Sequence, residues 1–96
     1  MYIMNERSGR ILNSTFVVEF FVAKTSDCTL LSYLLGGNEK PYTLERYKTQ
    51  KDATEALCSL MQALVTEQST FYVPESTFYF EESLRKDARV KRRGGS

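Results

Sequence analysis

The residues that could do chemistry are few, because this chain of 96 residues contains no histidine. Histidine is the commonest general base, triad member and metal ligand in proteins. Ser83 and Lys86 have the Ser-x-x-Lys spacing of a nucleophile and its base, but the pattern is short and stands in a charged segment. Glu81 and Glu82 are adjacent, so their side chains point to different sides of a helix or strand. The sequence therefore predicts no catalytic residue and a protein that is not an enzyme.

The other residues with reactive or ligand-binding potential favour structural roles. Cys28 and Cys58 lack both the close pairing and the histidine partners of a zinc site. A disulfide between them is open from the sequence, although free thiols are more common without a secretory signal. We expect Cys58 to be a small buried hydrophobic residue. Gly36 and Gly37 lack the lysine of a phosphate-binding loop, which favours a hairpin turn. We expect neither a metal nor a cofactor.

Charge is distributed unevenly along the chain. Residues 1–84 contain seven basic and eleven acidic side chains, a net −4, whereas residues 85–96 contain six basic and one acidic, a net +5. A nucleic-acid-associated accessory factor is therefore the alternative function, but the acidic body would repel a polyanion while attracting the tail. The candidate polyanion contacts are the six basic residues of the tail: Arg85, Lys86, Arg89, Lys91, Arg92 and Arg93.

Aromatic side chains are concentrated after residue 70, in two near copies of Ser-Thr-Phe-Tyr that begin at Ser69 and Ser76. Aromatic and β-branched residues around Pro74 predict a short strand, a bend and a second extended piece. The aromatic side chains either complete the sheet and close the core, or form a contact surface for a second copy or another protein. The candidate interaction surface comprises Phe71, Tyr72, Phe78, Tyr79 and Phe80.

One amphipathic helix is expected over residues 49–65. Thr49 and Asp52 have the spacing of a capping box, which marks the start of a helix. The apolar residues that follow recur with the helical period and predict one buried face. They are Ala53, Ala56, Leu57, Leu60, Met61, Leu64 and Val65.

The residues before this helix predict a sheet. A hairpin is expected from residues 2–4 and 10–12, and further strands from residues 15–24, 29–35 and 42–47. Short links between these strands favour antiparallel pairing. In the strand at 15–24, alternation predicts that Phe16, Val18, Phe20 and Val22 face the core. The predicted fold is α+β: an antiparallel sheet of four to five strands on one main amphipathic helix, with a short C-terminal helix after residue 81. We expect a single domain over residues 1–84 and a basic tail over residues 85–96.

Two stretches carry a resemblance to known proteins. Ile11-Leu12-Asn13 leads into a strand rich in Val and Phe, and Leu44, Tyr47 and Thr49 form a Leu-x-x-Tyr-x-Thr segment that enters an alanine-containing helix. This order resembles a group of small uncharacterised proteins of Gram-positive bacteria and their phages. The resemblance covers about the first two thirds of the chain and implies no catalytic residue.

Composition limits the class of protein and its location. Apolar residues make up 42% of the chain and charged residues 26%, which is typical of a folded domain. No apolar run approaches the ~20 residues of a bilayer crossing, and we see no secretory signal, so we expect a cytoplasmic protein without a membrane partner. The predicted function is a small non-enzymatic interaction or accessory protein whose partner is a second copy or another protein.

Overall fold

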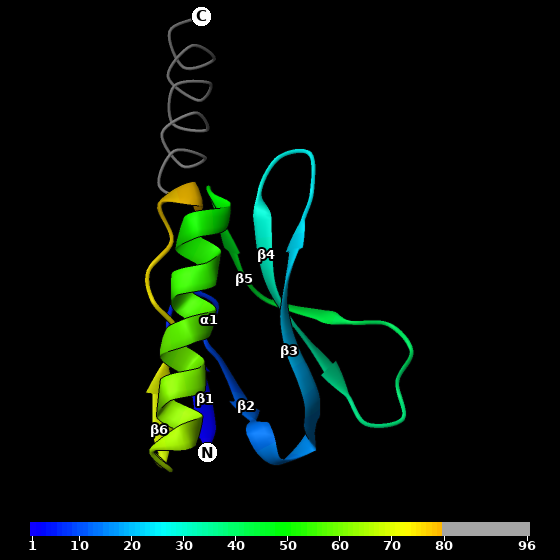
Figure 1. Ribbon diagram of the computed structural model, residues 1–96, viewed down its shortest axis with the longest axis vertical. Helices are drawn as coiled ribbons and strands as arrows, with labels where there is room; N and C mark the ends of the chain where they lie inside the picture. The colour runs from blue at the N-terminus through cyan, green and yellow to red at the C-terminus, as the bar shows by residue number, and fades with distance from the viewer. Residues whose placement is uncertain (80–96) are drawn as a thin grey trace, which may run out of the picture.

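The computed structural model describes residues 1–79 and contains two three-stranded sheets and one long helix (Figure 1). The first sheet has the order β2-β1-β6 and the second has the order β3-β4-β5. The strands are β1 (Tyr2–Asn5), β2 (Arg10–Asn13), β3 (Val17–Lys24), β4 (Thr29–Leu35), β5 (Tyr42–Tyr47) and β6 (Thr70–Tyr72), and the helix is α1 (Gln50–Val65). The α+β class is confirmed. The single sheet of four to five strands is not, because a 3-10 helix over Ser14–Phe16 separates β2 from β3 and each strand joins a different sheet.

The first sheet combines a predicted hairpin with a strand from the far end of the described chain. Strands β1 and β2 pair antiparallel, and Gly9 adopts the left-handed conformation that the turn between them requires. The antiparallel pairing predicted for the strands before the helix is confirmed, whereas β6, which follows the helix, pairs with β1 in parallel. The long connection that a parallel pair needs is provided by the chain between β1 and β6, which contains the second sheet and α1.

The second sheet follows the predicted strand boundaries closely, but its first strand is irregular. Val17 pairs with Leu35 and Glu19 with Leu34, which makes Val18 the extra residue of a β-bulge. The prediction that Phe16 and Val18 face the core is wrong, because Phe16 lies in the 3-10 helix, Val18 lies in the bulge, and both are exposed. Beyond the bulge the alternation holds, since Phe20 and Val22 pack against the core.

Helix α1 begins as predicted, with Thr49 as its N-cap. The Thr49 hydroxyl accepts a hydrogen bond of 3.1 Å from the Asp52 amide. The buried face is narrower than the predicted stripe and consists of Ala53, Ala56, Leu60 and Ala63. Met61, Leu64 and Val65 are exposed, and Cys58 is exposed rather than buried, because these residues turn away from both sheets. Cys28 and Cys58 are both free.

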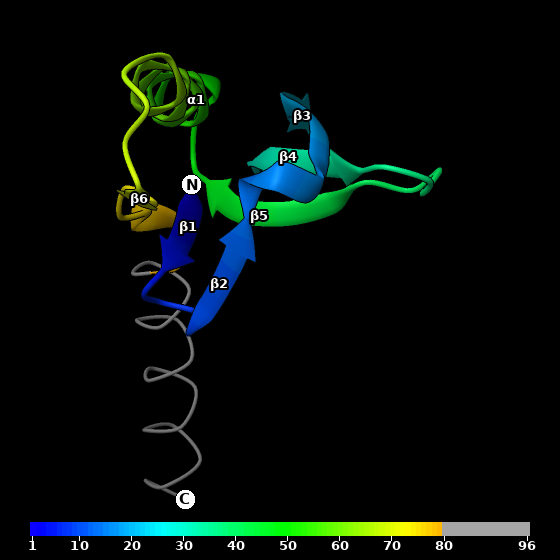
Figure 2. The same cartoon turned by 90° about the horizontal axis from the view of Figure 1, so that it is seen from below.

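The helix joins the two sheets through two clusters of buried side chains. Ile3, Leu60, Ala63 and Phe71 form the cluster on the first sheet, and Leu31, Tyr47, Ala53 and Ala56 form the cluster on the second. Leu44 packs against both clusters. Figure 2, viewed nearly along α1, shows the helix at one side of the molecule, with β6 and β1 below it and the second sheet to the right. One helix face therefore stabilises the packing of both sheets.

The chain after β6 departs from the second extended piece that the aromatic repeat predicted. Residues 77–79 are helical, and the Ser76 hydroxyl accepts a hydrogen bond of 3.2 Å from the Phe78 amide at their start. The expected short helix after residue 81 lies outside the described residues. Within residues 1–79, no helix is long and apolar enough to cross a membrane.

The buried helix face gives a direct test of the packing. Leu60 is fully buried, whereas the neighbouring Met61 is 57% exposed. We expect Leu60→Ala to lower the free energy of unfolding by about 2–5 kcal/mol, because removing the side chain leaves a cavity where the helix meets the first sheet. The matched control Met61→Ala should change it by less than about 1 kcal/mol. Equal losses for the two variants in chemical denaturation would contradict the observed orientation of α1.

Candidate functional site

A second β-bulge, in β5, turns a carboxylate into the interior. Leu31 pairs with Glu45 and Ser32 pairs with Thr43, so Leu44 is the extra residue. The bulge lets Leu44 pack against the core while Glu45, its neighbour in the chain, is 2% exposed. A buried carboxylate costs several kcal/mol unless opposite charge and hydrogen-bond donors surround it. The surroundings of Glu45 supply both.

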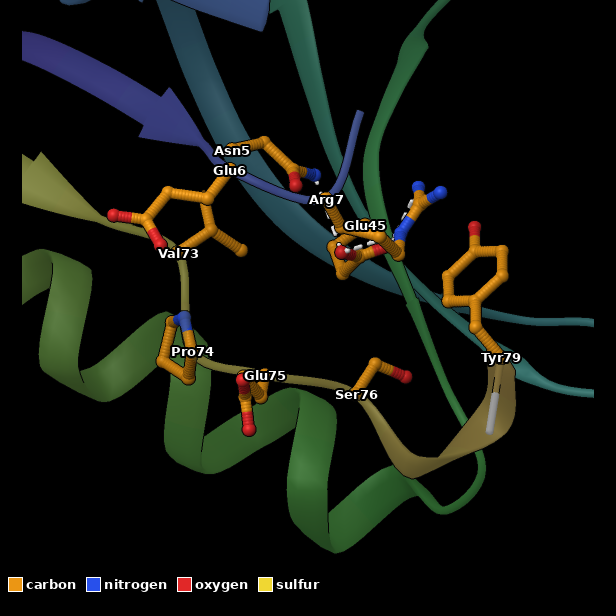
Figure 3. Close-up of a pocket in the computed structure, with 9 residues that line it drawn as sticks. All are labelled: Asn5, Glu6, Arg7, Glu45, Val73, Pro74, Glu75, Ser76 and Tyr79. Carbon is orange, nitrogen blue, oxygen red and sulfur yellow. Dashed lines mark hydrogen bonds and ion pairs between the residues drawn. The ribbon is translucent and has the colours of Figure 1, made fainter. Parts of the chain in front are cut away.

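Arg7, Asn5 and a backbone amide hold the Glu45 carboxylate (Figure 3). The Arg7 guanidinium donates through Nε to both oxygens, at 3.3 and 3.2 Å, and through Nη2 to Oε1 at 3.1 Å. The Asn5 amide donates to Oε2 at 3.2 Å, and the Arg46 backbone amide donates to Oε1 at 2.9 Å. Asn5 also donates to the carbonyl of Leu44 at 2.8 Å, at the bulge itself. The network therefore joins the end of β1 and the following turn to β5.

Tyr79 extends this network to the end of the described chain. Its ring lies 3.5 Å from the Arg7 guanidinium carbon, in a cation–π contact. Burial raises the pKa of the Tyr79 hydroxyl, and the negative charge of Glu45 raises it further. Tyr79 therefore stays protonated and neutral at physiological pH. The cation of Arg7 thus has a carboxylate partner from β5 and an aromatic partner from the chain after β6.

The segment between β6 and Tyr79 is held on β5 by two further hydrogen bonds. The buried Tyr47 hydroxyl donates to the Pro74 carbonyl at 2.8 Å, and the Ser76 hydroxyl donates to the Arg46 carbonyl. Burial, followed by the charges of Glu45 and Asp52, raises the pKa of Tyr47, which keeps the hydroxyl a donor at physiological pH. Val73 continues the first sheet, because its amide donates to the Met4 carbonyl at 2.9 Å. The segment therefore fixes the position of β6.

A cavity of about 540 Å³ lies within this network. Two of its polar side chains are engaged by neighbouring groups: the Glu45 carboxylate accepts from Arg7, Asn5 and Arg46, and the Ser76 hydroxyl contacts Arg46 and Phe78. Within residues 1–79, no three side chains of the metal-binding types gather closely enough to hold an ion. The arrangement is suited to fixing the ends of three segments in place. The lining residues are Asn5, Glu6, Arg7, Glu45, Val73, Pro74, Glu75, Ser76 and Tyr79.

The aromatic residues that the sequence singled out do not lie together on one surface. Phe71 is buried in the core cluster of the first sheet, whereas Tyr72, its neighbour in the chain, is exposed. Phe78 and Tyr79 are half-buried and pack edge to face, with ring centroids 5.2 Å apart. Phe80 and the six basic residues from Arg85 to Arg93 lie outside the described residues. Of the five aromatic candidates, Tyr72 is thus the exposed one within residues 1–79.

Tyr72 belongs to an apolar face of the first sheet, and the sequence did not predict that face. In the strand register, Met4 pairs with Ile11 of β2 and Tyr72 of β6, and Tyr2 pairs with Asn13 and Thr70. Directly paired residues point to the same side of a sheet, so these six side chains share one face, which we call the outer face. Tyr2 is 55%, Ile11 65% and Tyr72 56% exposed. The opposite face carries Ile3, Leu12 and Phe71 and packs on the core.

The run of consecutive apolar residues in β1 was the sequence signal that could have revealed the outer face. Tyr2 and Met4 are apolar and alternate with Ile3, so β1 has apolar side chains on both faces. Such a strand is expected to be covered on both sides.

Comparison of the chain with family models, curated proteins and solved structures gives no match. The candidate site therefore rests on the geometry of the chain itself.

The ion pair between Arg7 and Glu45 can be tested by a double-mutant cycle. Arg7→Met should lower the free energy of unfolding by about 1–3 kcal/mol, because it leaves the Glu45 carboxylate short of donors. The loss should fall below that of a fully buried pair, since the Arg7 side chain is 42% exposed and partly screened by solvent. Arg10→Met, at an exposed position of β2, is the control and should have little effect. The combination Arg7→Met with Glu45→Gln should be less destabilising than the sum of the single changes, and strict additivity in urea denaturation would refute the coupling.

Proposed function

We propose that this chain is a small protein-interaction or accessory protein that binds its partner through the outer face of the first sheet. The observation that carries the proposal is the exposure of Tyr2, Ile11 and Tyr72, each more than half exposed on one face. An exposed apolar patch of about a few hundred Å² is often a functional contact surface. Tyrosine is also enriched among the residues that contribute most to binding.

The buried network supports this role because it makes the outer face rigid. β6 has only three residues, too few to hold its place by pairing alone. The contacts of Pro74, Ser76 and Tyr79 anchor the chain just beyond β6, and Arg7 anchors the turn just beyond β1. A binding surface that is already ordered loses less conformational entropy when it associates. The Glu45 network thus supports binding without contacting the partner.

The outer face is also a better candidate than the exposed apolar residues of α1. Those residues all lie on the single helix α1: Met61, Leu64 and Val65. Within residues 1–79, no backbone pairing connects them to an exposed strand face. On the outer face, apolar residues from three strands lie side by side in a fixed register. A flat surface made from paired strands presents more contiguous area to a partner than a single helix flank.

The proposal predicts that Tyr72→Glu abolishes partner binding without unfolding the chain. A carboxylate at the centre of an apolar interface costs desolvation energy that the partner cannot compensate, so we expect about tenfold or greater loss of binding. The measurement is quantitative cross-linking with mass spectrometry in cells that naturally produce the chain. The control is Tyr42→Glu, which places the same charge on an exposed tyrosine of the second sheet.

Thermal unfolding of both variants establishes that the fold is retained. Tyr72 is largely exposed, so Tyr72→Glu should lower the free energy of unfolding by no more than about 1 kcal/mol. Tyr42→Glu also removes a ring stack with Tyr33, with centroids 5.6 Å apart, and should lower it by about 1–2 kcal/mol. If Tyr72→Glu keeps every cross-linked protein that the unmodified chain captures, the outer face is not the binding surface and the proposal fails.

A further inference from the structure

We infer that the partner on the outer face is a second copy of this chain, packed face to face so that Met4 lies against Met4. This inference rests on the proposed function and identifies its partner. It depends on three features of the outer face: its geometry, its lack of charge and its area.

The geometry places Met4 at the centre of the face. β1 is the middle strand of the first sheet, and Met4 is flanked by its direct partners Ile11 and Tyr72. Two identical faces that pack together are related by a two-fold axis lying between them. An axis that lies over the centre of the face brings the two Met4 side chains together. With the axis along β1, Ile11 of each copy meets Tyr72 of the other.

The charge pattern is compatible with self-pairing. In a two-fold contact, the same patch meets itself, so a charged residue near the centre would approach its own like charge. The outer face avoids this repulsion because it contains no Asp, Glu, Lys or Arg: its six residues are Tyr2, Met4, Ile11, Asn13, Thr70 and Tyr72. The whole chain has a net charge of +1, so two copies also repel each other little over longer distances.

The area of the face sets the expected strength of the dimer. A tyrosine buries about 150–250 Å², so Tyr2 and Tyr72, just over half exposed, offer about 100 Å² each. With Ile11 and Met4, the four large side chains offer on the order of 350–400 Å² per copy, or about 800 Å² for the pair, below the 1,200–2,000 Å² of a stable complex. We therefore expect a reversible dimer that forms at high micromolar concentration. Because apolar contact drives it, its formation should depend little on salt.

The first measurement is solution mass by sedimentation velocity, from about 10 μM to about 1 mM chain. The unmodified protein should shift from monomer toward dimer over this range, equally at low and high salt. Tyr72→Glu should stay monomeric at every concentration, and Tyr42→Glu should behave like the unmodified chain. A monomer at 1 mM would overturn the inference, and so would a dimer that Tyr72→Glu leaves intact.

The second measurement is disulfide trapping at the proposed axis. Cys58 is exposed, so it is first replaced by alanine, while Cys28 is buried and stays. Met4→Cys in this background should form a cross-linked dimer under mild oxidation at least about tenfold faster than Val65→Cys, although Val65, at the end of α1, is 73% exposed and Met4 is only partly exposed. Equal rates at the two positions would place the contact elsewhere.

The two proposals fail in different ways. If the unmodified chain is monomeric but Tyr72→Glu loses cross-links to other proteins, the outer face is an interaction surface and the second copy is the wrong partner. If Tyr72→Glu loses neither self-association nor any other partner, the proposed function itself is wrong.

Discussion

The burial of the Glu45 carboxylate is the constraint on which the remaining structure depends. A charge in this position is tolerated only if its partners are held in place, because an unpaired buried carboxylate would cost a large part of the stability of a small domain. The end of β1 must therefore bring Asn5 to β5, and the turn after it must bring Arg7. The same guanidinium then binds the ring of Tyr79, which fixes the chain beyond β6. The Arg7 guanidinium thus links both sheets and the end of the described chain.

The link from Glu45 through Arg7 to Tyr79 explains how β6, a short parallel edge strand, is held in the apolar outer face. β6 pairs with β1 over three residues, and the hydrogen bonds of Val73 and Pro74 continue its anchorage beyond the end of the strand. Phe71 points inward to the core, so Tyr72 must point outward beside Met4. The polar network and the core therefore determine together which side chains the first sheet exposes. Under the proposed function, this surface is ordered before binding, and a partner adds only apolar contacts to it.

Local signals predicted most of the secondary structure, and tertiary packing decided what they missed. The N-cap at Thr49 and the strand boundaries from β1 to β5 follow from side-chain types and spacing within a few residues. The two bulges do not, because each depends on a neighbouring strand, and they determine that Val18 is exposed and Glu45 is buried. A glutamate in an alternating strand is expected to be exposed, so nothing in the residue pattern predicted a buried network. The aromatic repeat correctly indicated a strand at residues 70–72 but could not show that Phe71 and Tyr72 would have opposite roles.

The exchange rate of the Arg7 Nε proton with solvent tests the central ionic link most directly. This proton lies between the guanidinium and both oxygens of Glu45, so nuclear magnetic resonance should show it exchanging at least about tenfold more slowly than that of the exposed Arg10. Glu45→Gln, which keeps the shape and removes the charge, should accelerate the exchange of Arg7 and leave Arg10 unchanged. If Arg7 and Arg10 exchange at the same rate in the unmodified chain, Glu45 does not hold Arg7 and the account is wrong.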